Sequence, residues 1–355
     1  MTSVALDPHN ELVGVLVMSH GTPRSLEELP RFYTEIRRGS PPTPELLADL
    51  ERRYLAIGGV SPLTEVTAAQ VAGITRSLEM LRPGRYVVAS GTKFASPRIE
   101  DAVAELAEVG ARRAIGIVLA PHSSVTSVGD YIRRARHAAN SPGASGNGPL
   151  ALEVVDHWYE DRGLVLLLAE RVREALSLIR EAGTGATEVL FTAHSVPTRF
   201  IDEGDDYAEQ VQESAGAVAD AAGVDRWRVA WQSAGRTDET WLGPDVCEVI
   251  SAIAGSGCAG VVLCPIGFVS DHLEVLYDLD IEAGGVAARA GLTFARTASL
   301  NDDARFCEVL ARVVLAADAD TVTDAGTAAN ADTVTDADTV ANTVTDADTE
   351  RKTDS

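Results

Sequence analysis

Short apolar runs alternate with longer amphipathic segments along most of the chain. The runs end in small or polar residues, as buried β-strands do, and they occupy 12–18, 86–89, 114–119, 152–155, 188–191, 227–231 and 260–263. Between them lie segments with helical spacing of apolar residues, such as 99–110, 163–183 and 245–257. This alternation predicts an α/β fold with parallel sheets covered by helices on both faces.

An internal repeat divides the chain into two parts. ELVGVLVMSHGTP (11–23) and ATEVLFTAHSVP (186–197) share a strand, a small residue, a histidine and a later proline. The segments that follow each of them also match as strand, loop, helix and strand. We therefore expect two similar doubly wound domains, over 1–150 and 151–317, with a last helix at about 301–317 packing back on the first. Such sheets bind ligands at the carboxyl ends of their strands.

The last segment, 318–355, has a different composition. It holds ten acids and two bases, repeats DTVTDA, and lacks any side chain larger than valine before its basic end. Such a sequence predicts a disordered acidic tail, more simply a solubilising extension than a partner site. Removing its charge of −8 from the total of −23 leaves −15. An acidic body argues against nucleic acid as a partner.

The chain has the features of a cytoplasmic protein. No apolar run approaches the roughly 20 residues of a membrane helix, and the N-terminus lacks the regions of a signal peptide. No CxxC spacing is present, so we expect free thiols and no iron–sulfur cluster; the cysteines are Cys247, Cys258, Cys264 and Cys307.

Several histidines follow predicted strands. His20, His122 and His194 each stand at a strand end, and Asp271, His272 and Glu274 follow the strand at 260–263. A single such histidine is usually a hydrogen-bonded turn residue, and we expect this of His122. His194 differs, because the repeat places it opposite His20 with an acidic helix nearby.

The acidic helix is predicted from SDHLEVLYDLDIE (270–282). Glu274, Asp278 and Glu282 recur every four residues, so their mutually repelling carboxylates share one side of a helix. A solvated face is one explanation, but the surrounding apolar residues favour carboxylates that serve a cation. Imidazole with carboxylates suits divalent metals such as Fe²⁺ in transit, and the same groups can take up protons. A π-type widening is also expected here.

Other chemistries lack their motifs. The chain has no P-loop, no GxGxxG after the first strand, no GxSxG at a strand end and no HExxH. The first half instead gathers basic and hydroxylated residues that can hold an acidic ligand by its edge; these are Arg37, Arg38, Arg53, Ser61 and Lys93.

Long ordered blocks of the sequence resemble the ferrochelatase family. They include SHGTP, FYTEIRRG, RYLAIGGVSPL, SPRIEDAVAE, VLAPHSS, AHSVP, GDDYAEQV, WQSAGRT, WLGPDV and PIGFVSDHLEVLYDLDIEA, and they span about 12 to 315. The chain is most similar to the short bacterial form, which inserts iron into coproporphyrin III. The resemblance implies two Rossmann-like domains, each a parallel four-stranded sheet flanked by helices, with a porphyrin cleft between them.

The resemblance also implies roles for individual residues. His194 matches the catalytic histidine and Glu274 its paired carboxylate, both at the metal. Asp278 and Glu282 match the outer acids of the metal-binding row. The implied porphyrin-binding residues are His20, Arg37, Arg38, Arg53, Ser61, Lys93 and Trp231. His20 replaces the tyrosine usual in these bacterial enzymes, where an imidazole can ligate iron and slow product release, and Phe94 replaces a histidine or tyrosine of some relatives.

The expected function is therefore insertion of Fe²⁺ into a porphyrin in haem biosynthesis, with coproporphyrin III favoured. Protoporphyrin IX is the first alternative substrate. A sirohydrochlorin or cobalt chelatase, or a non-enzymatic tetrapyrrole carrier, are further alternatives. We expect no tightly bound cofactor, although Mg²⁺ can occupy the outer acidic site. We also expect a monomer without a membrane segment, which hands its product to a later enzyme of the pathway.

Overall fold

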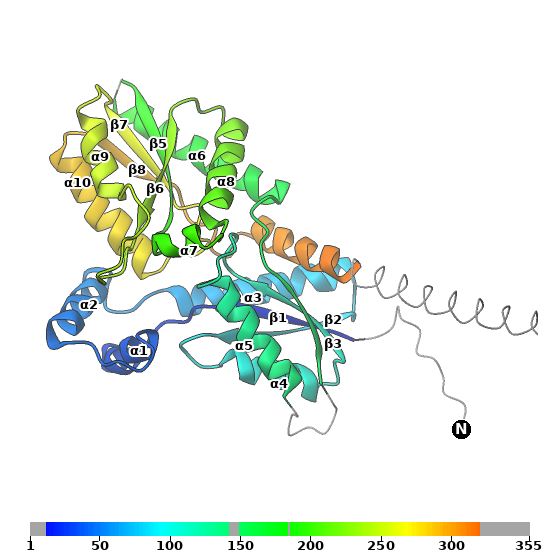
Figure 1. Ribbon diagram of the computed structural model, residues 1–355. Coiled ribbons are helices and arrows are strands. Elements are labelled where there is room, and N and C mark those ends of the chain that lie inside the picture. The colour runs from blue at the N-terminus through cyan, green and yellow to red at the C-terminus, as the bar shows by residue number, and fades with distance from the viewer. Residues whose placement is uncertain (1–11, 142–148, 184, 320–355) are drawn as a thin grey trace, which may run out of the picture.

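The computed structural model describes residues 12–141, 149–183 and 185–319. They form two parallel sheets in separate halves of the molecule (Figure 1). The first sheet has the order β2-β1-β3-β4, with β1 at Val13–Ser19, β2 at Tyr86–Thr92, β3 at Arg113–Val118 and β4 at Ala151–Val155. The second has the order β6-β5-β7-β8, with β5 at Thr187–His194, β6 at Trp227–Gln232, β7 at Gly260–Cys264 and β8 at Thr293–Arg296. The identical strand order confirms the two-domain α/β fold that the repeat predicted. The boundary predicted after residue 150 was too early, because β4 pairs with β3 in the first sheet.

Helices flank both sheets. Those of the first domain are α1 (Leu29–Ile36), α2 (Pro44–Ala56), α3 (Leu63–Leu81), α4 (Ile99–Glu108) and α5 (Val128–Asn140), with a short 3₁₀ turn at Leu26–Glu28. Those of the second are α6 (Arg162–Ala182), α7 (Thr198–Asp202), α8 (Tyr207–Ala222), α9 (Val246–Ala254), a π-helix at Glu274–Ala283 and α10 (Gly284–Arg289). The predicted helices correspond to α4, α6 and α9 within a few residues.

All seven predicted strands are present, and β8 is the one described strand that was not predicted. It is only four residues long, lies at the edge of its sheet, and has no buried side chain. A short strand of this kind lacks the continuous apolar run of a central parallel strand.

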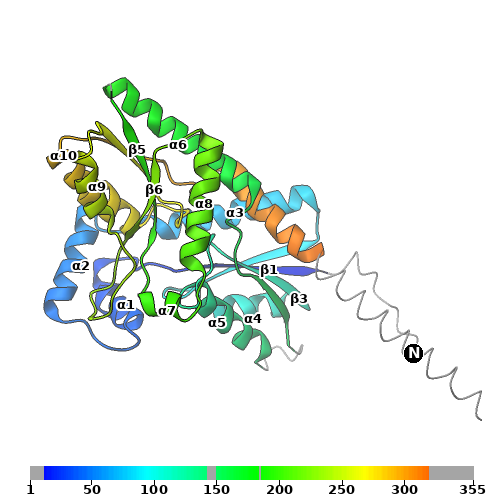
Figure 2. The same cartoon turned by 45° about the horizontal axis from the view of Figure 1, so that its top comes forward.

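The helix over 304–319 packs against both domains (Figure 2). Its buried Phe306 and Leu310 share one apolar cluster with Ile74 of α3. A Cβ atom on Gly73 would lie 2.3 Å from Sγ of Cys307, so glycine permits this close approach. Arg171 of α6 holds the start of the same helix through Asp303, at 2.8 Å.

Asp318 belongs to this helix rather than to the predicted tail. It is buried, accepts a hydrogen bond from the Tyr86 hydroxyl at 2.6 Å, and forms an ion pair with Arg113. The predicted start of the tail at Asp318 was therefore too early. The contacts of Asp318 with Tyr86 and Arg113 cannot be recognised from the composition of the segment. Residues 320–355, the rest of that tail, lie outside the described residues. In the described ranges, no helix is both long and apolar enough to cross a membrane.

Candidate active site

His194 and Glu274 meet at the centre of the candidate site. His194 is the last residue of β5, and Glu274 is the first residue of the π-helix that follows the β7 loop. Nε2 of His194 lies 3.6 Å from Oε1 of Glu274, and the two side chains are 37% and 36% exposed. The fold thus brings together two side chains that are eighty positions apart in the sequence. Both the imidazole and the carboxylate are accessible to a ligand.

The surroundings of His194 fix its orientation. Its Nδ1 donates a hydrogen bond to the carbonyl of Ser195 at 2.5 Å, and the carbonyl of His194 accepts a hydrogen bond from the Tyr207 hydroxyl at 3.1 Å. Nε2 is therefore the atom that faces Glu274. Burial alone lowers the pKa of His194, but the Glu274 carboxylate and the Ser195 carbonyl outweigh it and raise the pKa to about 9. Near pH 7 the imidazole of His194 is therefore protonated in the ligand-free protein.

Glu274 lies between two histidines. Oε2 of its carboxylate is 3.7 Å from Nε2 of His272, whose Nδ1 donates to the Ser270 carbonyl at 3.0 Å. Burial alone raises the pKa of Glu274, yet His194 and His272 together hold it well below its usual range. Glu274 is therefore an anion at neutral pH. His272 was not among the predicted site residues, and its position in SDHLE beside the acids is the sequence signal that could have identified it.

The acid row lies on a π-helix, as expected from repulsion between its carboxylates. Asp278 is buried, and both its oxygens have partners: Arg53 Nη1 lies 3.1 Å from Oδ1, and the Ser233 hydroxyl donates to Oδ2 at 2.5 Å. Burial and the nearby Glu274 raise the pKa of Asp278 to about 6. Glu282 is exposed at the far end of the row. The row thus runs from the His194–Glu274 pair to the surface, with its middle member enclosed.

The other acids of the stretch serve the fold. Asp271 accepts hydrogen bonds from the Ser299 hydroxyl at 2.7 Å and the Asn301 amide at 2.9 Å. Asp280 forms an ion pair with Arg296 at 2.6 Å. Within the described residues, no group of three or more His, Cys, Asp or Glu side chains is placed so that it could hold a metal ion.

His20 lies at the equivalent strand end of the first domain. It follows β1, its Nδ1 donates to the Gly21 carbonyl at 3.0 Å, and its ring lies 4.8 Å from Phe94 and 6.1 Å from Phe32 between centroids. These surroundings desolvate the charged form and lower the pKa of His20 to about 4. The charge of Glu274 raises this pKa and that of His272 lowers it, but both effects are smaller than that of burial. His20 is therefore neutral, with Nε2 available as an acceptor.

The model of the family described as ferrochelatase matches residues 12–318. The chain belongs to the ferrochelatase family. It is 40% identical over 305 residues to the coproporphyrin III ferrochelatase of Bacillus subtilis (strain 168), covering 85% of this chain and 97% of that protein. It is 41% identical over 307 residues to the enzyme of the same name from Anoxybacillus flavithermus (strain DSM 21510 / WK1), covering 86% and 96%.

A solved structure shares the fold at low identity. SirB from Bacillus subtilis with Fe³⁺ superposes with a TM-score of 0.52 and 12% identity, covering 87% of this chain and 98% of that one. At this identity the likeness supports the fold only. Membership of the ferrochelatase family makes the chain a metal chelatase.

The porphyrin residues implied by the family lie in different environments. Lys93 is buried and paired with Asp130 at 2.9 Å, so its charge is already balanced. Ser61 is buried, and its hydroxyl accepts from the Leu63 amide at 3.3 Å. Arg37 donates to the Ser40 carbonyl at 3.3 Å, and Arg38 is exposed with a positive φ of 56°. Of these four, the two arginines are the more open to a ligand.

Trp231 occupies the core beneath the site. It is 6% exposed and packs on Tyr207, with ring centroids 5.7 Å apart. Little of the indole is left to meet a porphyrin. Through Tyr207, whose hydroxyl binds the His194 carbonyl, Trp231 instead supports the strand end that carries His194.

His122 is not the hydrogen-bonded turn residue that its position suggested. It is 3% exposed, stacks on Tyr159 at 5.4 Å, and neither ring nitrogen has a hydrogen-bond partner in the described structure. Burial lowers the pKa of His122 to about 3, so it is neutral. The sequence predicted a polar residue at this strand end. It gave no indication of the Tyr159 and Tyr207 rings that pack on His122.

Proposed function

We propose that the protein inserts Fe²⁺ into coproporphyrin III, giving coproheme for haem biosynthesis. The carrying observation is the His194–Glu274 pair at the carboxyl end of β5, with His20 at the equivalent strand end of the first domain. In this proposal a macrocycle held between the two strand ends has a histidine on each side. The named function of the Bacillus and Anoxybacillus relatives, at 40% and 41% identity, supports coproporphyrin III as the substrate.

In this proposal the protein bends the porphyrin so that the pyrrole nitrogens become accessible. Insertion replaces two pyrrole protons by one Fe²⁺, so two protons have to leave. In the ligand-free protein His194 is protonated, because its pKa is about 9, and it can neither bind iron nor accept a proton. The approach of a cation to Glu274 releases that proton. Neutral His194 then serves either as the base or as the last iron contact, with Glu274 beside it.

Iron would enter along the acid row. Glu282 is the exposed first contact, and Glu274 is the last before the porphyrin. Asp278 acts mainly through its charge, because Arg53 and Ser233 already occupy its oxygens. We also propose that Mg²⁺ can occupy the outer part of this row, near Glu282.

We further propose a cytoplasmic monomer without a resident cofactor, which delivers its product to a later enzyme of the pathway. The four free cysteines of the described residues fit the reducing conditions of a cytoplasm. Iron and sulfide analysis of protein purified without oxygen tests the absence of a cluster. Stoichiometric acid-labile sulfide would contradict it.

The test of the function is a side-by-side assay of initial rates with anaerobic Fe²⁺. Coproporphyrin III should give a higher kcat/KM than protoporphyrin IX, and sirohydrochlorin should give no detectable rate. Preference for protoporphyrin IX would overturn the substrate assignment. Stoichiometric haem binding without iron incorporation would instead establish a carrier.

A further inference from the structure

Helix α2 projects from the first domain and lies against the second (Figure 1). Of its thirteen residues only Tyr54 is buried, and the Tyr54 hydroxyl hydrogen-bonds to the hydroxyl of Thr22 in the first domain at 3.1 Å. Because few of its side chains are buried, α2 is weakly attached to its own domain and costs little to move.

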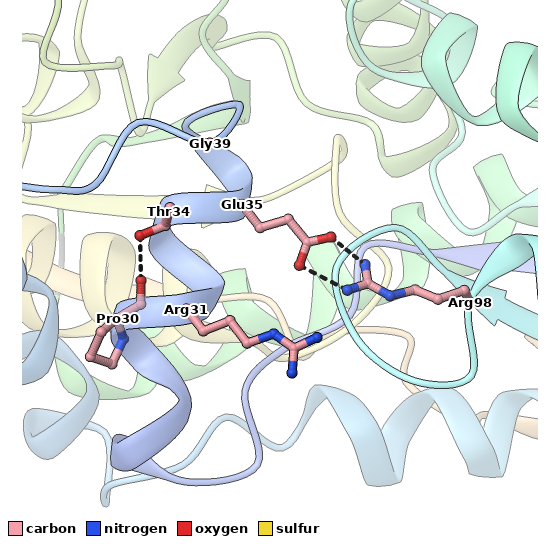
Figure 3. A pocket seen from close by; sticks show the side chains of 6 residues that line it. All are labelled: Pro30, Arg31, Thr34, Glu35, Gly39 and Arg98. Carbon is pink, nitrogen blue, oxygen red and sulfur yellow. Dashed lines mark hydrogen bonds and ion pairs between the residues drawn. The ribbon is translucent and has the colours of Figure 1, made fainter.

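Glycines in the left-handed backbone region stand on both sides of α2. Gly39 precedes the helix with a φ of 88°, and Gly58 and Gly59 follow it with φ of 107° and 97°. A Cβ atom on any of the three would meet no atom beyond the neighbouring residues within 4 Å. Gly39 also lines a cavity of about 590 Å³ between α1 and the loop of Arg98 (Figure 3). The turns on both sides of α2 are therefore loosely packed and suited to act as hinges.

Two ion pairs of different exposure join α2 to the second domain. In the Arg53–Asp278 pair the side chains are 23% and 7% exposed. In the second pair Nη2 of Arg236 lies 2.7 Å from Oδ2 of Asp49, and the side chains are 54% and 21% exposed. Solvent and salt compete with the Arg236–Asp49 pair, so it is the weaker of the two contacts.

Arg236 stands on a braced loop that follows β6. Trp241 donates from Nε1 to the Thr237 hydroxyl at 3.0 Å. A Cβ atom on Gly235 would lie 2.2 Å from the Trp241 ring, so the loop packs closely on the indole. The loop is therefore the fixed side of the Arg236–Asp49 pair, and α2 is the side that moves.

We propose that α2 is a lid on the cleft between the two domains, with the Arg236–Asp49 pair as its latch. The inference rests on the proposed function, in which the porphyrin is held between the domains. While the pair is formed, α2 bridges the domains beside the acid row. The porphyrin enters and the coproheme product leaves when the pair opens and α2 turns about its flanking glycines. An exposed ion pair is weak enough to open frequently.

The test measures how fast coproheme enters and leaves the protein. Stopped-flow quenching of protein fluorescence gives the association rate, and transfer to excess apomyoglobin gives the release rate. Arg236→Met should raise both rates about threefold. The Kd should stay the same, because the latch gates the ligand without contacting it. Arg236→Lys should recover part of the wild-type behaviour, since it restores a cation opposite Asp49.

Asp49→Asn separates a latch from simple attraction by charge. It changes the net charge in the opposite sense to Arg236→Met, so long-range attraction of the propionates would move the rates of the two variants in opposite directions. A latch makes both variants faster, and the double variant should be no faster than the faster single variant.

Arg199→Met is the matched control. Arg199 is also 54% exposed and pairs with Glu239 inside the second domain, so its replacement removes the same charge without touching α2. Unchanged rates in Arg236→Met would overturn the inference, as would faster release with an unchanged association rate, opposite effects of the two latch variants, or equal acceleration by Arg199→Met. If wild-type protein binds coproheme but inserts no iron, the proposed function fails, while the rate comparison still decides the role of the latch.

Discussion

Arg53 of α2 and Asp278 of the π-helix form an ion pair between the two domains, with Nη1 3.1 Å from Oδ1. The same guanidinium lies 4.9 Å from the centre of the Tyr277 ring. Neighbouring Arg52 donates to the Tyr277 hydroxyl at 2.6 Å. The ion pair therefore anchors the middle of the acid row to the first domain. Glu282, at the far end of the row, is exposed to solvent.

Replacing Arg53 should destabilise the protein, because it leaves the Asp278 carboxylate buried without its cation. Arg53→Met is expected to lower the free energy of unfolding by about 2 kcal/mol, since Arg53 itself is partly exposed. Urea denaturation at pH 8 measures the change. Arg312→Met, at an exposed pair, should change it by less than about 0.5 kcal/mol. Equal effects of the two substitutions would show that the Arg53–Asp278 pair has no special role.

Replacing Glu282 should weaken iron capture rather than chemistry. Glu282→Ala is expected to raise the apparent KM for Fe²⁺ about fivefold with kcat little changed, because a distant carboxylate contributes mainly to local concentration of the cation. Asp280→Ala is the control, since it removes the same charge from the same helix at a residue paired with Arg296. If both variants have the same KM for iron, the entry path is wrong.

Binding of iron should release a proton. His194 has a pKa of about 9, so it is protonated at pH 7.5 and has to lose its proton before Nε2 can bind metal. The apparent affinity for Fe²⁺ should rise about tenfold per pH unit in this range and level off above about pH 9. Anaerobic calorimetry in buffers of different ionisation enthalpy measures the proton count. Release of the same number of protons by His194→Ala would exclude His194 as their source.

His20 should bind the iron of the product. It is neutral at physiological pH, because its pKa is about 4, and its Nε2 has no hydrogen-bond partner among the described residues. His20→Ala is expected to shift the Soret band of bound product and to speed product release several-fold. Stopped-flow transfer of product to apomyoglobin gives the release rate. An unchanged spectrum and release rate would show that His20 does not ligate the iron.

Much of the architecture could be predicted from local pattern. Buried parallel strands require continuous apolar runs, and this identified every strand except the short edge strand β8. Repulsion along the acid row correctly suggested a π-helix. The position of His194 and His20 at strand ends was enough to predict both as site residues.

The remainder depends on tertiary contacts that no local pattern records. The enclosure of Asp278 comes from Arg53, more than two hundred positions away, and from Ser233, which has an unusual positive φ of 59°. The charge state of His194 depends on its distance from Glu274. Asp318 looked like part of an acidic tail because its partners, Tyr86 and Arg113, are distant in sequence.

The central claim is that the His194–Glu274 pair performs metal insertion, and a single-turnover assay of His194→Ala tests it most directly. With coproporphyrin III bound and anaerobic Fe²⁺ in excess, the variant should bind the porphyrin within about threefold of wild type. Its insertion rate should fall at least about a thousandfold. Wild-type insertion by His194→Ala, at equal porphyrin occupancy, would contradict the account.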